Sequence, residues 1–205
     1  MREPNTRTRV AVMVPDNYYR LALISLIRDR SDLFDVTGIF SSLPELYIHL
    51  QNESVDSVIT SCRGLGDSFQ DWIDFYTYHK KTFKNIKTLI IDSTVALNIH
   101  CAFFLRAHEL TAYLDRKSSI KDFTNYLIES VAYECSTVMS GRVLIASNQL
   151  SVLESDVITY YLTGMSTELI AKKFNKTAKA ISYYKRRAMR KIGVENDMEL
   201  IYYAS

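Results

Sequence analysis

Short apolar runs alternate with longer amphipathic stretches through the first 135 residues of the chain. A run of four to eight apolar residues is typical of a buried strand, and apolar positions spaced by three and four residues indicate a helix. The runs predict five strands, at 10–14, 34–40, 57–60, 88–91 and 111–114. The stretches between and after them predict five helices, near 18–30, 44–51, 69–80, 95–105 and 120–134. This order predicts an α/β domain, a doubly wound parallel sheet of (βα)5 type, with its site at the carboxyl ends of the strands.

The last quarter of the chain predicts four short helices and no strand. Each helix is preceded by a residue that can cap it: Ser151, Ser166, Thr177 and Asn196. Glu154 and Glu199 follow the first and last of these at the spacing of a capping box, and Gly164 and Gly193 can end the first and third helices. The third helix is expected over 178–191, after a turn at Asn175 and Lys176. Four helices joined by short turns predict an all-α helix-turn-helix domain.

Positive charge is concentrated in one segment of this domain, from Lys172 to Lys191. The segment contains nine basic residues and no acidic residue, and it holds every Lys and Arg after position 147. Residues 148–205 therefore carry a net charge of +3, whereas residues 1–147 carry −1. A run of charge is usually a solvated surface, but this one lacks the interspersed Glu of such a helix. The segment indicates contact with nucleic-acid phosphates.

The predicted third helix has a buried and an exposed stripe. Ile181, Tyr184, Ala188 and Ile192 recur at helical spacing and are predicted to be buried. An exposed helix of this kind fits a major groove, and the residues expected to face the bases are Ser182, Tyr183, Arg186 and Arg190. The residues expected to contact phosphates lie beside this stripe or near the turn: Lys172, Lys173, Lys176, Thr177, Lys179, Lys185 and Arg187.

The segment 150–201 also resembles a known family. The residues that carry the resemblance are Leu150, Ser151, Glu154, Val157, Gly164, Ile170, Ala171, Phe174, Ile181, Lys191, Ile192, Gly193 and Val194. They resemble the LuxR-type helix-turn-helix of NarL/FixJ-class response regulators, and IAKKFN, AISYYKRRAMRKIGV and ENDMEL are similar to RcsB-like regulators of enteric bacteria. The resemblance implies a bacterial transcription regulator that binds double-stranded DNA. Ala180 and Ser182 stand where a Thr and a basic residue are usual, so the preferred base sequence does not follow.

The order of elements in residues 9–135 resembles the receiver domain of such regulators. A phosphorylatable receiver needs paired carboxylates for a divalent cation, an acceptor Asp, a hydroxyl and a Lys, each after a strand. The corresponding positions hold Asp16, Ser61, Asp92 and Asp115. A shift of one or two residues would restore the hydroxyl at Ser93 or a basic group at Arg116 or Lys117, but residues 58–63 contain no Asp. We therefore predict a degenerate receiver, a pseudo-receiver that is not phosphorylated on Asp.

Other classes of protein find little support in the composition. No apolar run reaches the roughly 18 residues that cross a bilayer, and the three cysteines form no C-x-x-C pair. The four histidines lack metal-ligand spacing, and no P-loop or nucleophile motif occurs. We expect a cytoplasmic protein that is not an enzyme and has no cofactor or metal.

These patterns divide the chain into a pseudo-receiver at 1–135, a linker at 136–147 and a DNA-binding domain at 148–205. Single modules of this kind gain affinity by pairing on two half-sites, so we expect a homodimer or a heterodimer with an RcsB-like response regulator. The predicted dimer contact lies at 96–105 and 111–113, which include Phe103 and Phe104. The last helix, over 197–204, is expected to pair the DNA-binding domains.

Two alternatives remain open. The first is a small-molecule sensor, because Trp72 and Tyr76 have the spacing of residues that line the ligand cavity in autoinducer-binding LuxR proteins. This spacing is more often ordinary packing on one helix face. The second is an antagonist that titrates a related regulator through protein contacts.

Overall fold

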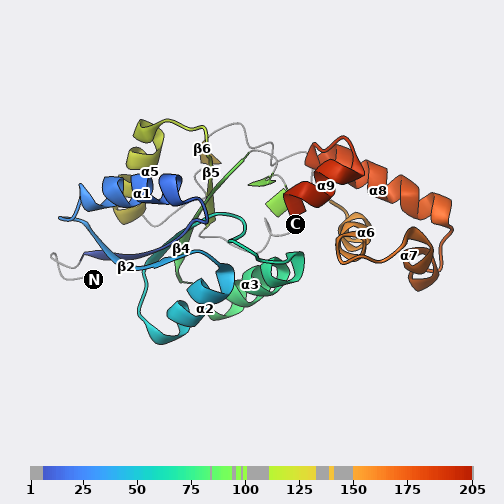
Figure 1. The fold of residues 1–205 in the computed structure, drawn as a ribbon, viewed down its shortest axis with the longest axis horizontal. Helices are drawn as coiled ribbons and strands as arrows, with labels where there is room; N and C mark the ends of the chain where they lie inside the picture. Colours follow the sequence, from blue (N-terminus) through green and yellow to red (C-terminus); the bar gives the residue numbers. More distant parts are fainter. Residues whose placement is uncertain are drawn as a thin grey trace.

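The structure of the chain, a computed structural model, describes residues 7–83, 85–93, 96–97, 99–100, 111–132, 139–140 and 150–204. The N-terminal strands are β1 Thr8–Met13, β2 Phe34–Phe40, β3 Ser57–Thr60, β4 Lys87–Asp92, β5 Thr111–Asp115 and β6 Met139–Ser140. The helices among them are α1 Asn17–Arg28, α2 Leu43–Asn52, α3 Phe69–Thr82 and α5 Ile120–Ala132. The C-terminal helices are α6 Val152–Leu162, α7 Thr167–Lys173, α8 Ala178–Ile192 and α9 Asp197–Ala204. Figure 1 shows the N-terminal α/β part at the left and the C-terminal helical part at the right.

The strands form one parallel sheet in the order β2-β1-β3-β4-β5-β6. Helices α1 and α5 cover one face, and α2 and α3 cover the other (Figure 1). Successive side chains of a strand point to opposite faces of a sheet. In β1, Val10 and Val12 accordingly pack with α1 and α5, whereas Ala11 and Met13 pack with α2 and α3. Burial on both faces explains why these strands read as continuous apolar runs.

The doubly wound α/β fold predicted from the sequence is confirmed, and the five predicted strands agree with β1–β5 to within two residues at each end. Strand β6 was not predicted. It pairs with β5 through Met139 and Ser140, within the stretch expected to be the linker. The predicted helix near 95–105 is described at 96–97 and 99–100, which are helical. The rest of that helix, including Phe103 and Phe104 of the expected dimer contact, and most of the linker lie outside the described residues.

The four predicted C-terminal helices are also confirmed. Val157, Ile170, Ala171 and Ile181, one or two from each of α6, α7 and α8, form a small buried core. Half-buried Tyr160, Phe174 and Tyr184 pack around it. In the described part of the chain, no helix combines the length and the apolar character needed to cross a membrane.

Candidate nucleic-acid interface and strand-end site

The C-terminal helices begin where the sequence predicts. Ser151 accepts a hydrogen bond from the backbone N–H of Glu154, whose carboxylate accepts one from the backbone N–H of Ser151 at 2.7 Å. Ser166 caps α7, and Thr177 accepts a hydrogen bond from the backbone of α8 at 3.2 Å. Each cap satisfies an N–H that has no partner inside the helix. Because the caps are local, they fix the start of α8 without depending on the rest of the chain.

The turn between α7 and α8 is tight. Asn175 has φ 50°, a left-handed conformation that Asn tolerates better than most residues. The N–H of Lys176 then bonds to the carbonyl of Ala171 at 2.9 Å, which closes the end of α7. The predicted turn at Asn175 and Lys176 is confirmed, and it brings the lysines at the end of α7 near the first turn of α8.

Helix α8 lies with one face in the core and the other in solvent. Ile181, Ala188, Met189 and Ile192 are buried, while Tyr184 is half-buried. On the opposite stripe Tyr183 is 57% exposed, Arg186 and Arg190 are exposed, and Ser182 is half-buried. The predicted division of the helix into two stripes is therefore found in the structure.

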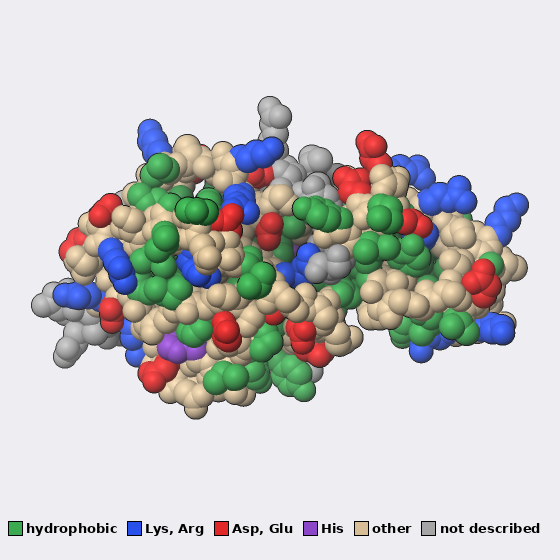
Figure 2. Space-filling view, viewed as in Figure 1, with side chains coloured by type: hydrophobic (Ala, Val, Ile, Leu, Met, Phe, Trp, Pro, Cys, Tyr) green, Lys and Arg blue, Asp and Glu red, His purple; other side chains and the backbone are tan. Residues whose placement is uncertain are grey.

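Four lysines surround the start of this exposed stripe: Lys172, Lys173, Lys176 and Lys179. All are exposed, and none takes part in an ion pair among the described side chains. Lys173 lies over the ring of Tyr160 at 4.6 Å and Lys176 over that of Tyr184 at 5.9 Å, within cation–π range. Figure 2 shows Lys and Arg side chains gathered on the outer end of the helical part. This surface attracts anions.

Two basic residues of α8 for which the sequence predicts phosphate contacts, Lys185 and Arg187, form ion pairs with carboxylates of the same domain. Arg187 Nε lies 2.9 Å from Glu154 Oε1, and Lys185 Nζ lies 2.6 Å from Asp197 Oδ2. Lys185 also lies 4.1 Å from the ring centre of Tyr161, whose hydroxyl donates to Asp197 at 2.9 Å. These contacts join α6, α8 and α9, so both cations have a role inside the domain.

Glu154 is a fully buried carboxylate with two cationic neighbours. Lys191 Nζ donates to Glu154 Oε2 at 2.6 Å, in addition to the ion pair with Arg187. Burial alone would raise the pKa of Glu154, but hydrogen bonds from Lys191 and Ser151 outweigh it, and the net pKa lies below the usual range. The group is therefore ionised at neutral pH and fastens α8 to the start of α6. The sequence predicted that Glu154 takes part in the capping box, but it did not show the contacts with Lys191 and Arg187.

The last helix presents an apolar surface. Leu200 is buried, whereas Met198, Ile201 and Tyr202 are exposed. Asn196 caps the helix by accepting from the N–H of Glu199 at 2.8 Å. In the predicted capping box the carboxylate of Glu199 would accept from the backbone N–H of Asn196. In the structure it accepts instead from the N–H of Glu195, at 2.7 Å.

The four residues at the positions compared with a receiver, Asp16, Ser61, Asp92 and Asp115, lie at or just after the carboxyl ends of their strands. Asp16 caps α1 and is paired with Arg116, which follows β5 and also lies over the ring of Tyr19. Two hydrogen bonds lower the pKa of Asp16: the larger effect comes from the N–H of Tyr19 and the next from Arg116. Ser61 is buried directly after β3, where its N–H bonds to the carbonyl of Met13. The carboxylate of Asp16 is thus in contact with the guanidinium of Arg116.

Asp92 and Asp115 end two neighbouring strands in direct register. Asp92 accepts from the backbone N–H groups of Cys62 at 3.0 Å and Ser93 at 2.7 Å. Burial raises the pKa of Asp92, although these hydrogen bonds oppose the shift. Asp115 accepts from the N–H of Lys117 at 2.7 Å. Within the described residues, no group of three His, Cys, Asp or Glu side chains could hold a metal ion.

Trp72 and Tyr76 are core residues of α3 in this structure. Both are almost fully buried, and their rings contact His100 at centroid distances of 5.7 and 4.3 Å. A pocket formed by described residues lies between α2 and α3, and neither Trp72 nor Tyr76 lines it.

Comparisons with known proteins agree with this architecture. Residues 148–204 match the family model described as bacterial regulatory proteins, luxR family. The transcriptional regulatory protein RcsB of Escherichia coli K12 is 28% identical over 180 residues, which cover 83% of this chain and 79% of RcsB. The transcriptional regulatory protein RcsA of Klebsiella aerogenes is 26% identical over 120 residues, 58% of this chain and 56% of RcsA.

Solved structures of RcsB share the fold. A structure of two RcsB dimers bound to two parallel DNAs aligns with a TM-score of 0.67 at 23% identity, covering 97% of this chain and 98% of that one. RcsB from Salmonella enterica serovar Typhimurium bound to promoter rprA aligns with a TM-score of 0.61 at 24% identity and the same coverage. Residues 148–204 of this chain are therefore a domain of the luxR family of bacterial regulatory proteins, in a chain with the two-domain fold of RcsB.

Proposed function

We propose that this chain is a sequence-specific transcription regulator that binds double-stranded DNA through α8. The observation that carries the proposal is the exposed stripe of Tyr183, Arg186 and Arg190 on a helix whose other face is buried. A helix anchored in this way can enter a major groove as a rigid element. Arg can donate two hydrogen bonds to guanine, and an aromatic side chain can contact a thymine methyl.

The exposed lysines supply the electrostatic part of binding. Lys172, Lys173, Lys176 and Lys179 flank the start of α8, where they can neutralise phosphates on either side of the groove. The hydroxyl of Thr177 accepts from the α8 backbone but keeps its own proton, which it can donate to a phosphate. Lys185 and Arg187 are assigned a different role, because their charges are already matched by Asp197 and Glu154. We place them as residues that position α8.

Dimerisation is the second part of the proposal. One domain of this size buries a limited DNA surface, and pairing on two half-sites raises affinity. The exposed apolar side chains of α9, Met198, Ile201 and Tyr202, provide a surface through which two DNA-binding domains can pair. The partner is a second copy of this chain or an RcsB-like regulator, and the protein acts in the bacterial cytoplasm.

The third part is that the N-terminal domain is a pseudo-receiver. The position after β3, where an acceptor Asp is needed, holds buried Ser61. Asp16 is already paired with Arg116, and Asp92 is bonded to two backbone N–H groups. Asp16 and Asp92 are thus already engaged by protein groups, which supports the proposal. Activity is then set by abundance, by a partner or by a ligand.

The DNA-binding proposal is tested by selecting sites from a random DNA pool, with and without an RcsB-like partner, and then measuring affinity for the selected site. Arg186→Ala should weaken binding about tenfold or more, since a lost base contact costs about 1–3 kcal/mol. Arg28→Ala is the matched control, because Arg28 is exposed at the end of α1. Unchanged affinity in Arg186→Ala would show that α8 does not read the bases. Failure to select any site, together with tight binding to the partner protein, would favour the antagonist.

The pseudo-receiver proposal is tested with acetyl phosphate and Mg²⁺. We expect no acyl-phosphate on this chain by intact mass or borohydride trapping, while RcsB treated in parallel serves as the positive control. A stoichiometric acyl-phosphate on this protein would refute the proposal.

A further inference from the structure

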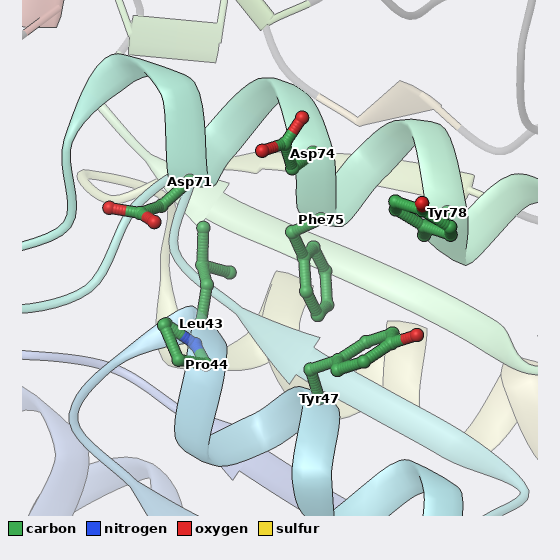
Figure 3. A pocket seen from close by; sticks show the side chains of 7 residues that line it. All are labelled: Leu43, Pro44, Tyr47, Asp71, Asp74, Phe75 and Tyr78. Carbon is green, nitrogen blue, oxygen red and sulfur yellow. The ribbon is translucent and has the colours of Figure 1, made fainter.

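Helices α2 and α3 lie on the face of the sheet opposite α1 and α5 (Figure 1). A pocket of about 360 Å³ lies between these two helices (Figure 3). Helix α2 contributes Leu43, Pro44 and Tyr47 from its first turns. Helix α3 contributes Asp71, Asp74, Phe75 and Tyr78, which share one face because they are spaced by three, four and seven residues. The volume is within the range of about 300–1,000 Å³ that is usual for small-molecule sites.

The pocket has an apolar floor and an aromatic mouth. Leu43 and Phe75 are buried, and Phe75 points from α3 toward α2 (Figure 3). Tyr47 is half-buried and Tyr78 is 57% exposed, with their ring centroids 6.3 Å apart. Phe83 supports Tyr47 by an edge contact at 5.9 Å. Because the walls belong to two packed helices, the site is largely formed before any ligand enters.

The charged groups in the lining are both acidic. Asp71 accepts from the N–H and the hydroxyl of Ser68 at 2.9 and 2.7 Å, and these bonds lower its pKa. Asp74 accepts from the side-chain amide of Gln70 at 2.9 Å. Among the described side chains, neither carboxylate takes part in an ion pair. The two negative charges are therefore not neutralised by a described neighbour.

We propose that this pocket binds a small amphipathic cation, a protonated amine attached to an aromatic or aliphatic group. The apolar body of such a ligand would lie on Leu43 and Phe75. Its ammonium group would lie between the carboxylates and the faces of the tyrosines, which attract cations through the ring quadrupole. An anionic ligand is disfavoured by repulsion from Asp71 and Asp74.

The size of the site favours a small molecule over a protein segment. A docked helix uses anchors over two or more turns, and a stable protein interface takes about 800 Å² from each partner. Seven lining residues from two helices provide only one compact pocket. The site also lies away from α8, so ligand binding can be measured without DNA and does not depend on the proposed DNA-binding function.

The test uses three probes of similar shape: 2-phenylethylamine as the cation, 2-phenylethanol as the neutral molecule and phenylacetate as the anion. Each is titrated into the isotope-labelled full chain and followed by backbone amide shifts. We expect saturable shifts confined to α2 and α3, with the amine binding at least fivefold more tightly than phenylacetate. Equal affinity for the three probes, shifts elsewhere or no saturation with the amine would overturn the proposal.

Variants test the assigned groups. Asp74→Asn and Tyr78→Ala change exposed side chains and should each weaken amine binding about twofold to fivefold, the range for a single exposed charge or cation–π contact. Glu53→Gln is the control, since Glu53 is exposed after the end of α2 and does not line the pocket. Unchanged affinity in both pocket variants, or an equal loss in the control, would contradict the proposed binding mode.

Discussion

Replacing Glu154 by Gln tests whether the buried carboxylate fastens α8 to α6. Gln keeps the size of the side chain and can still accept the capping hydrogen bond, so the substitution removes mainly the charge. Breaking a fully buried ion pair costs about 3–5 kcal/mol, and a single hydrogen bond to a charged group contributes about 1.5–3 kcal/mol. The side chains of Lys191 and Arg187 are 23% and 49% exposed, so both cations can regain water. We therefore expect a loss of about 2–3 kcal/mol.

The measurement can separate the two domains. The single tryptophan, Trp72, reports on the N-terminal domain, whereas hydrogen exchange of α6 and α8 amides reports on the C-terminal domain. Far-ultraviolet circular dichroism follows the helices of both domains. Glu154→Gln should lower the unfolding free energy of the C-terminal domain and leave the Trp72 fluorescence transition unchanged. Glu168→Gln is the matched control, because Glu168 is an exposed residue in the first turn of α7. An effect no larger than that of the control, below about 0.5 kcal/mol, would refute the reasoning.

The pH dependence follows from the lowered pKa of Glu154 in the folded domain. A carboxyl whose folded pKa is depressed stabilises the fold above its unfolded pKa, and this stabilisation is lost as pH falls through the folded pKa. The difference in stability between the native chain and Glu154→Gln should therefore be fully present at neutral pH and shrink in acid. A difference that grows as pH falls would contradict the assignment.

Four further substitutions test the other assigned contacts. Lys176→Ala and Lys179→Ala should each weaken binding to all DNA sequences and reduce the slope of log K against log salt by about 0.9. An unchanged slope would show that the substituted lysine does not contact a phosphate. Asp197→Asn should lower the stability of the C-terminal domain by about 1 kcal/mol and increase hydrogen exchange in α9, because the substitution removes the negative charge that Lys185 and Tyr161 share. Exchange like that of the native chain would show that this charge does not hold the helix. Arg116→Ala should raise the pKa of Asp16 only part of the way to its ordinary value, since the hydrogen bond from Tyr19 remains, and a carboxyl-carbon titration that shows no change would exclude the ion pair.

The features that could be predicted from the sequence are those determined by near neighbours. A cap such as Thr177 bonds to a backbone N–H three residues away, so its chemistry is visible in the local sequence. The strands were predictable because burial on both faces leaves an uninterrupted apolar run. Strand β6 gave no such signal, since it consists of only Met139 and Ser140 and is recognised by their pairing with β5.

Long-range contacts explain what the sequence did not show in the candidate site. By their spacing, Arg187 and Lys185 lie beside the stripe of the helix that is expected to face DNA. No acidic residue is near them in the sequence. Their carboxylate partners, Glu154 and Asp197, come from α6 and α9 and approach only when the helices pack. The same limit applies to the α2–α3 pocket, which requires the relative placement of two helices.

The basic segment thus serves two purposes that its sequence does not distinguish. Lys185 is paired with Asp197, and Arg187 and Lys191 share Glu154, so these ion pairs hold the helices together. The remaining six basic residues, Lys172, Lys173, Lys176, Lys179, Arg186 and Arg190, are exposed and form no ion pair among the described side chains. A recognition helix needs this division, because a cation that is paired with a carboxylate must weaken that contact before it can bind a phosphate. In the proposed complex the charge offered to DNA is therefore chiefly that of these six residues, and its position around the start and outer stripe of α8 supports the proposed orientation of the helix in the groove.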